Sequence, residues 1–69
     1  MNRAERVLQY IRDFGSITSK EAFNDLGYTR LSAAISEIKR DGYKIRKSYE
    51  TKKNRYGQPV TYARYTLGE

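Results

Sequence analysis

The side chains of this sequence best suited to chemistry are cations, and they are unevenly distributed. Residues 29–69 hold ten Lys and Arg against four Asp and Glu, whereas residues 1–28 hold four of each kind. The net charge is +6, so the whole excess lies in the second part of the chain. A protein that presents one surface to a polyanion needs such an asymmetry, whereas basicity for solubility alone does not. We therefore expect the C-terminal part to bind a polyanion.

The residues that most catalytic and metal sites require are missing. The sequence has no Cys and no His, which excludes disulfides, the usual ligands of structural zinc and the His base of Ser or Cys hydrolases. The acidic residues show neither paired nor metal-ligand spacing, and no Gly-rich phosphate loop precedes a helix. We expect the protein not to be an enzyme and to use no metal and no cofactor.

The length limits the chain to one small domain. Its 69 residues can hold one hydrophobic core at most, so we expect a single domain over residues 1–69. A hydrophobic content of 38%, with seven Tyr and two Phe, favours a folded module over disorder. The N-terminus does not read as a signal peptide, and no apolar stretch approaches about twenty residues. We expect a cytoplasmic protein without a membrane partner.

Apolar residues at helical spacing predict three helices before Gly42. The first spans about residues 3–14 and begins after Asn2. The second, about two turns long, begins with the capping box of residues 18–21 (TSKE). The third has Thr29 as its N-cap and buries Leu31, Ala34, Ile35 and Ile38. Only residues 27–28 join the second and third helices, which suits the tight turn of a helix-turn-helix.

After Gly42 the apolar period changes from 3.6 to 2, which predicts a β-hairpin. Its strands cover about residues 43–50 and 60–67, and residues 51–59 form a long basic tip. Ile17 either packs ahead of the second helix or pairs with the hairpin as a one-residue strand. Tyr56 is expected to pack on the hairpin as a turn plug, and the alternative is an exposed aromatic contact. The tyrosines expected to cover the hairpin's apolar face are Tyr43, Tyr49, Tyr62 and Tyr65.

Several stretches together resemble a known family over about residues 3–67. They are residues 16–22 (SITSKEA), 26–33 (LGYTRLSA), 42–45 (GYKI), 54–60 (NRYGQPV) and 62–65 (YARY). With the order of elements, they resemble the small winged helix-turn-helix domains often encoded by bacteriophages and prophages. The resemblance implies an α+β fold, a three-helix core followed by a two-stranded β-hairpin wing. It also implies DNA binding, usually in transcriptional control or DNA transactions.

The third helix is suited to enter the major groove. Its outward face is narrow and polar, with donors near the N-terminus. Arg30 can bond a guanine bidentately, Ala33 can meet a thymine methyl, and Thr29 can hold a phosphate together with backbone amides. The alternative is that these are only good cap and solvent-face residues. The predicted base-reading residues are Thr29, Arg30, Ser32, Ala33 and Ser36.

The basic tip clusters like charges, which repel one another unless an anion binds. Asn54 and Arg55 suit the minor groove, and Lys52 and Lys53 suit phosphates. The alternatives are a solvated tip that deters edge-to-edge aggregation and, for cations near the hairpin's start, support of the helix dipole or a strand's polar face. The predicted backbone or minor-groove contacts are Lys20, Lys39, Arg46, Lys52, Lys53, Asn54, Arg55 and Arg64.

The predicted partner is double-stranded DNA, bound by a phage or prophage transcriptional regulator in the nucleoid of a bacterial host. One alternative is a protein-interaction module that binds an acidic surface of a host protein. Another is an architectural or recombination accessory protein. RNA recognition wants a larger stacking platform than two strands offer. No heptads or spare helix are visible, so we expect a monomer or a weak dimer.

Overall fold

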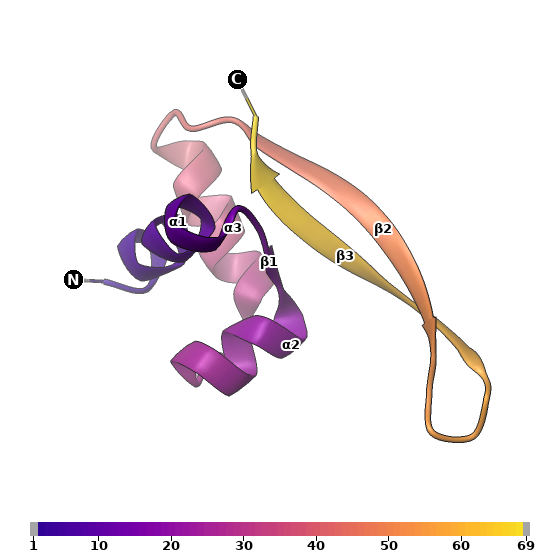
Figure 1. Ribbon diagram of the computed structural model, residues 1–69. Helices are drawn as coiled ribbons and strands as arrows, with labels where there is room; N and C mark the ends of the chain where they lie inside the picture. Colours follow the sequence, from indigo (N-terminus) through magenta and orange to yellow (C-terminus); the bar gives the residue numbers. More distant parts are fainter. Residues whose placement is uncertain (1, 69) are drawn as a thin grey trace.

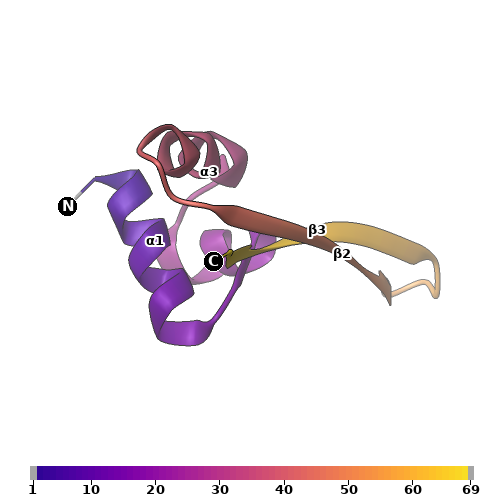
Figure 2. The ribbon, with the colours of Figure 1, turned by 90° about the horizontal axis from the view of Figure 1, so that it is seen from above.

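The computed structural model describes residues 2–68 and has the predicted α+β architecture. Helices form a body from which a long β-hairpin extends as an arm (Figures 1 and 2). The molecule measures 39 × 25 × 20 Å. Its elements, in chain order, are α1 (Arg3–Phe14), β1 (Ile17–Thr18), α2 (Ser19–Glu21), the π-helix η1 (Ala22–Leu26), α3 (Leu31–Arg40), β2 (Ile45–Lys53) and β3 (Pro59–Leu67).

Local capping fixes where the first two helices begin. The Asn2 side chain accepts a hydrogen bond from the Glu5 amide at 2.8 Å, ahead of α1. At α2, Thr18 Oγ1 accepts from the Glu21 amide and Glu21 Oε1 accepts from the Thr18 amide, which confirms the capping box. The helix then widens into η1 and ends at Gly27, whose positive φ of 73° a side chain would disfavour.

The predicted N-cap of α3 is wrong. The helix begins at Leu31, Arg30 occupies the cap position, and no side chain caps the helix. Residues 27–30 therefore join the helices, rather than 27–28 alone. Within this connector Tyr28 packs against the hydrophobic core, so the chain needs more residues before it turns into α3. Thr29 lies exposed outside the helix.

The sheet has three strands in the order β1-β3-β2, all antiparallel. Ile17 and Thr18 pair with Tyr65 and Arg64, so the strand alternative for Ile17 is confirmed, and the predicted two-stranded hairpin gains β1 as a short third strand. Since Ile17 is fully buried, this pairing satisfies backbone groups that water cannot reach. β2 and β3 pair from Ile45↔Leu67 to Lys53↔Pro59, which leaves a tip of residues 54–58, shorter than predicted.

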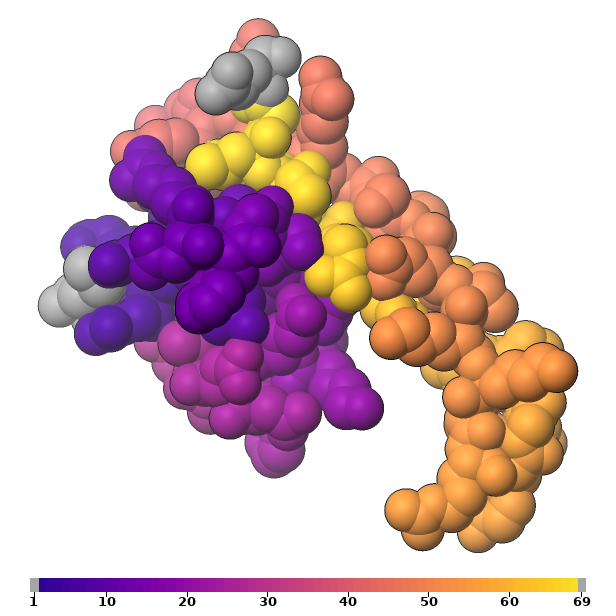
Figure 3. Space-filling view, viewed as in Figure 1, coloured from indigo at the N-terminus to yellow at the C-terminus, as the bar shows by residue number. Residues whose placement is uncertain are grey.

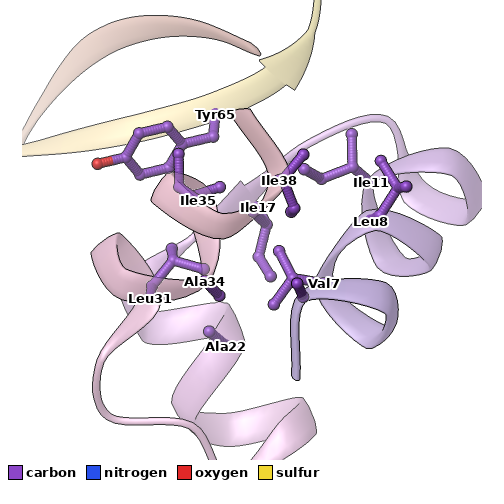
Figure 4. Close-up of a cluster of buried hydrophobic side chains, with 11 residues drawn as sticks. Val7, Leu8, Ile11, Ile17, Ala22, Leu31, Ala34, Ile35, Ile38 and Tyr65 are labelled. Carbon is purple, nitrogen blue, oxygen red and sulfur yellow. The ribbon is translucent and has the colours of Figure 1, made fainter. Parts of the chain in front are cut away.

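The core lies between α1, α3 and the base of the sheet (Figure 4). Tyr65 of β3 lies beside Ile35 of α3, and Ile38 packs with side chains of α1. The prediction that four tyrosines share one apolar face is wrong. Tyr62 and Tyr65 point to opposite faces because strand side chains alternate, while Tyr43 and Tyr49 are exposed.

Candidate nucleic-acid interface

The outward face of α3 is open to solvent. Its apolar stripe, Leu31, Ala34, Ile35 and Ile38, is buried against the core. On the other side Ser32 and Ser36 are exposed and Ala33 is half-buried, with exposed Thr29 and Arg30 just ahead of the helix. The five predicted base-reading residues therefore all lie outside the core, four of them exposed and one half-buried. Figure 2 shows α3 at one edge of the helical body, beside the base of the hairpin.

The charged residues of α3 differ in whether they form ion pairs. Lys39 and Arg40 are exposed in the last turn. Glu37 forms an ion pair with Arg3 of α1, which neutralises the carboxylate nearest the small polar face. The exposed cations at the end of α3 thus remain available to an anion.

The end of the hairpin far from the helical body, residues 52–58, is the wing tip, and it carries cations. Lys52, Lys53 and Arg55 are all exposed. In the part of the chain that the structure describes, none of them forms an ion pair. The sequence has no acidic residue between Glu50 and Glu69. The nearest carboxylate in the sequence, Glu50, is paired with Arg64, so it offsets their charge only in part.

A groove of about 410 Å³ separates α2 from the wing, and Figure 3 shows it as a hollow between the helical body and the orange tip. Lys20 of α2 lies on one side and Lys52 and Lys53 of β2 on the other. Sequence reasoning assigned these three cations to one function without knowing that they meet. The residues lining the groove are Thr18, Ser19, Lys20, Glu21, Lys52, Lys53, Asn54, Val60, Tyr62 and Arg64.

The side chain of Asn54 shapes the tip instead of reaching outward. Its Oδ1 accepts hydrogen bonds from the amides of Tyr56 at 2.9 Å and Gln58 at 3.0 Å. Its Nδ2 donates to Gln58 Oε1 at 3.2 Å. The predicted minor-groove contact by Asn54 is therefore corrected, because its polar atoms already hold the loop. The turn plug is also wrong, since the Tyr56 side chain is 84% exposed.

Arg64 is engaged in ion pairs and is not free for DNA. Its guanidinium lies 3.0 Å from Glu50 Oε1 and 3.5 Å from Glu21 Oε1, and it donates to Ser16 Oγ at 2.8 Å. The hydrogen bond to Glu50 raises the pKa of Arg64, and the same bond lowers the pKa of Glu50. We withdraw the predicted DNA contact by Arg64. Its role is to tie β3 to β2 and to the start of α2.

This network makes part of the stability depend on pH. The lowered pKa of Glu50 in the folded state means that its contribution is complete above the unfolded pKa, about 4.3, and is lost as the pH falls through the folded value. We expect Glu50→Gln to lower the Tm at pH 7, and to lower it progressively less as the pH falls below about 4.3. Thermal melts of both proteins across this range test it. A Tm difference that stays constant with pH would contradict the assignment.

The cations at the base of the hairpin, Arg46 and Lys47, lie in different environments. Arg46 lies at the start of β2, and its Cγ would sit 2.9 Å from a Cβ added at Gly68. The structure thus does not bring Arg46 to the tip cations. Lys47, which sequence reasoning did not select, lies 5.2 Å from the ring centroid of Tyr49 and 5.9 Å from that of Tyr65. The alternation of strand side chains predicts that Lys47 and Arg46 point to opposite faces of the hairpin, but only the fold shows which rings Lys47 covers.

Comparison with known proteins adds one finding. A family model described as a winged helix-turn-helix domain matches residues 2–69. Searches of curated proteins and of solved structures gave no match. Among residues 2–68, no helix has the length and apolar character needed to cross a membrane.

Proposed function

Because the chain belongs to the winged helix-turn-helix domain family, a fold that binds DNA, we propose that it binds double-stranded DNA with α3 in the major groove. In this arrangement the wing tip lies against the adjacent minor groove or backbone. The observation that carries the proposal is the pairing of an exposed, small polar helix face with wing-tip cations that form no ion pair within residues 2–68. Each of these two features suits a different part of a duplex.

The phosphate contacts would come from three parts of the chain. Lys52 and Lys53 lie on the wing beside Arg55, and Lys20 of α2 lines the groove together with these two lysines. Lys39 extends the cationic surface from the end of α3. Lysine serves as a point charge for phosphates, whereas the planar guanidinium of Arg55 suits a narrow minor groove.

Base reading is proposed for the residues on the outward side of α3. Arg30 stands at the cap position, and its exposed side chain forms no ion pair within residues 2–68. Ser32 and Ser36 follow on the same exposed side, and Ala33 offers a methyl group. These short side chains let the helix approach base edges closely.

We expect Arg30→Ala to relax base preference at one position of the site and to weaken specific binding by about 1 to 3 kcal/mol. The reason is the loss of a bidentate contact to guanine. Binding to a set of duplexes with single base changes measures it. Arg6→Ala, which removes an exposed cation of α1, is the matched control. An unchanged preference in Arg30→Ala would show that Arg30 reads no base.

We also propose that binding serves transcriptional control, as in the phage and prophage domains that the sequence resembles. Selection of bound sequences from a random DNA pool tests this. A regulator predicts one recurring motif, and a single or repeated half-site then gives the oligomeric state on DNA. Sequence-blind, weak attachment would favour a protein partner instead. DNA bending without a motif would favour an architectural role.

A further inference from the structure

We propose that Tyr56 at the wing tip, together with Arg55, enters the DNA minor groove, and that Asn54 positions both of them. The inference rests on the proposed function, because it needs the wing to lie on DNA. It assigns Tyr56 as a DNA contact, and it replaces the direct contact predicted for Asn54 by a positioning role.

The first observation is the exposure of Tyr56. Its side chain is 84% exposed, the highest value among the exposed large hydrophobic residues, which include Phe14 at 72% and Tyr49 at 65%. Covering an exposed aromatic ring with a binding partner lowers the free energy, because apolar surface is removed from water. Lys52, Lys53 and Arg55 surround the ring in sequence. A partner of this tip must therefore be anionic and must offer an apolar wall as well.

The second observation is that the tip is held in shape by its own hydrogen bonds. In addition to the hydrogen bonds of the Asn54 side chain, the backbone amide of Asn54 donates to the Gln58 backbone carbonyl at 2.8 Å. The backbone carbonyl of Asn54 accepts from the Gly57 amide at 3.0 Å. Gly57 takes the positive φ of 77° that closes the turn. A loop fixed in this way loses little conformational entropy on binding. Such a loop is suited to insertion.

The minor groove matches this combination. It is about 6 Å wide, which admits a flat ring or guanidinium edge-on, and its floor presents the acceptors adenine N3 and thymine O2. The Tyr56 hydroxyl and the Arg55 guanidinium can both donate to them, while the ring lies against the deoxyribose walls. A·T tracts narrow the groove and attract arginine. The lysines behind the tip would then face the phosphates on its rims.

An acidic protein surface would satisfy the cations, but it would give no role to the exposed aromatic ring that lies among them in the sequence. Unpaired bases would also stack on the ring, but proteins that bind single strands stack successive bases on several aromatic side chains, and Tyr56 is the one aromatic residue in the range 52–58. Titration with polyglutamate and with single strands distinguishes both possibilities from minor-groove binding.

The experiment uses tryptophan fluorescence, because the chain contains no Trp. The Tyr56→Trp variant carries a single indole at the tip. On titration with an A·T-rich duplex we expect its emission to shift to the blue in step with binding, which is followed separately by the anisotropy of a labelled duplex. Phe14→Trp, exposed on α1, is the control and should not respond. Netropsin, which fills the A·T minor groove, should reverse the signal.

Affinity and positioning are measured in the same assay. We expect Tyr56→Ala to lose about tenfold in affinity for the A·T-rich duplex. Asn54→Ala should reduce the blue shift of the Tyr56→Trp indole while leaving the salt slope unchanged, since that slope counts phosphate contacts. A purely structural defect of the wing would lower both.

Binding of the duplex with an unresponsive indole in Tyr56→Trp would overturn this inference and leave the proposed function standing. A signal that netropsin does not reverse would overturn the minor-groove assignment. A response to polyglutamate stronger than to the duplex would overturn it in favour of an acidic protein, and a stronger response to single strands in favour of stacking. No duplex binding by the unmodified protein would overturn the proposed function as well.

Discussion

Replacing Lys52 and Lys53 together by alanine is expected to weaken binding to every duplex and to flatten the dependence of log K on log salt by about 1.8 units. Each cation that neutralises a phosphate releases counterions worth about 0.9 unit of slope. Both side chains are exposed and free of ion pairs with any residue in the range 2–68. Their removal should therefore leave the fold intact and change the electrostatics alone.

Equilibrium titrations at several salt concentrations, with a specific and a random duplex, measure this effect. The loss should be similar for both duplexes, because phosphate contacts carry no sequence information. A control with Arg6 and Arg12 of α1 replaced by alanine removes charge from another element and should change the slope little. A wing variant that kept the wild-type slope would show that the tip does not touch DNA.

The largest expected effect on stability comes from Ile38→Ala. Ile38 is 1% exposed and lies between α1 and the sheet (Figure 4). Truncating a buried isoleucine to alanine costs about 2 to 5 kcal/mol, against a total stability of about 3 to 10 kcal/mol for a domain of this length. The variant should therefore lose about half of its free energy of unfolding, since the cavity removes packing contacts inside the core.

Urea unfolding followed by circular dichroism gives the free energy of unfolding for this comparison. Phe14→Ala removes a larger side chain, but one that is 72% exposed, so it should cost far less. Equal losses for Ile38→Ala and Phe14→Ala would contradict the placement of the core.

Local signals predicted most of the fold. The Asn2 cap, the capping box at residues 18–21 and the glycines after α1 and η1 act within a few residues of one another, so they can be read from the sequence. The start of α3 could not, because the packing of Tyr28 against the core moved it past Thr29. The pairing of β1 with β3 joins residues 17 and 65, which lie far apart in the sequence, and no local sequence pattern indicates such a pairing.

The same distinction applies to the site. Exposure of the α3 face and of the tip follows from alternation and helical periodicity, and these predictions needed no tertiary knowledge. Arg64 was misassigned because its partners Glu21 and Glu50 come from two other elements. Asn54 was misassigned because an amide at a turn serves the backbone as readily as a ligand. The meeting of Lys20 with the wing is likewise a product of the fold.

The central claim is that the exposed side of α3 and the wing tip form one DNA-binding surface. Backbone amide NMR of the uniformly labelled protein, titrated with its selected duplex, tests it most directly. We predict that the chemical-shift changes on addition of DNA are largest for residues 29–40 and 52–58, and that the signals of residues 9–14 of α1 change little. Shifts centred on α1, with α3 and the wing unchanged, would contradict the account.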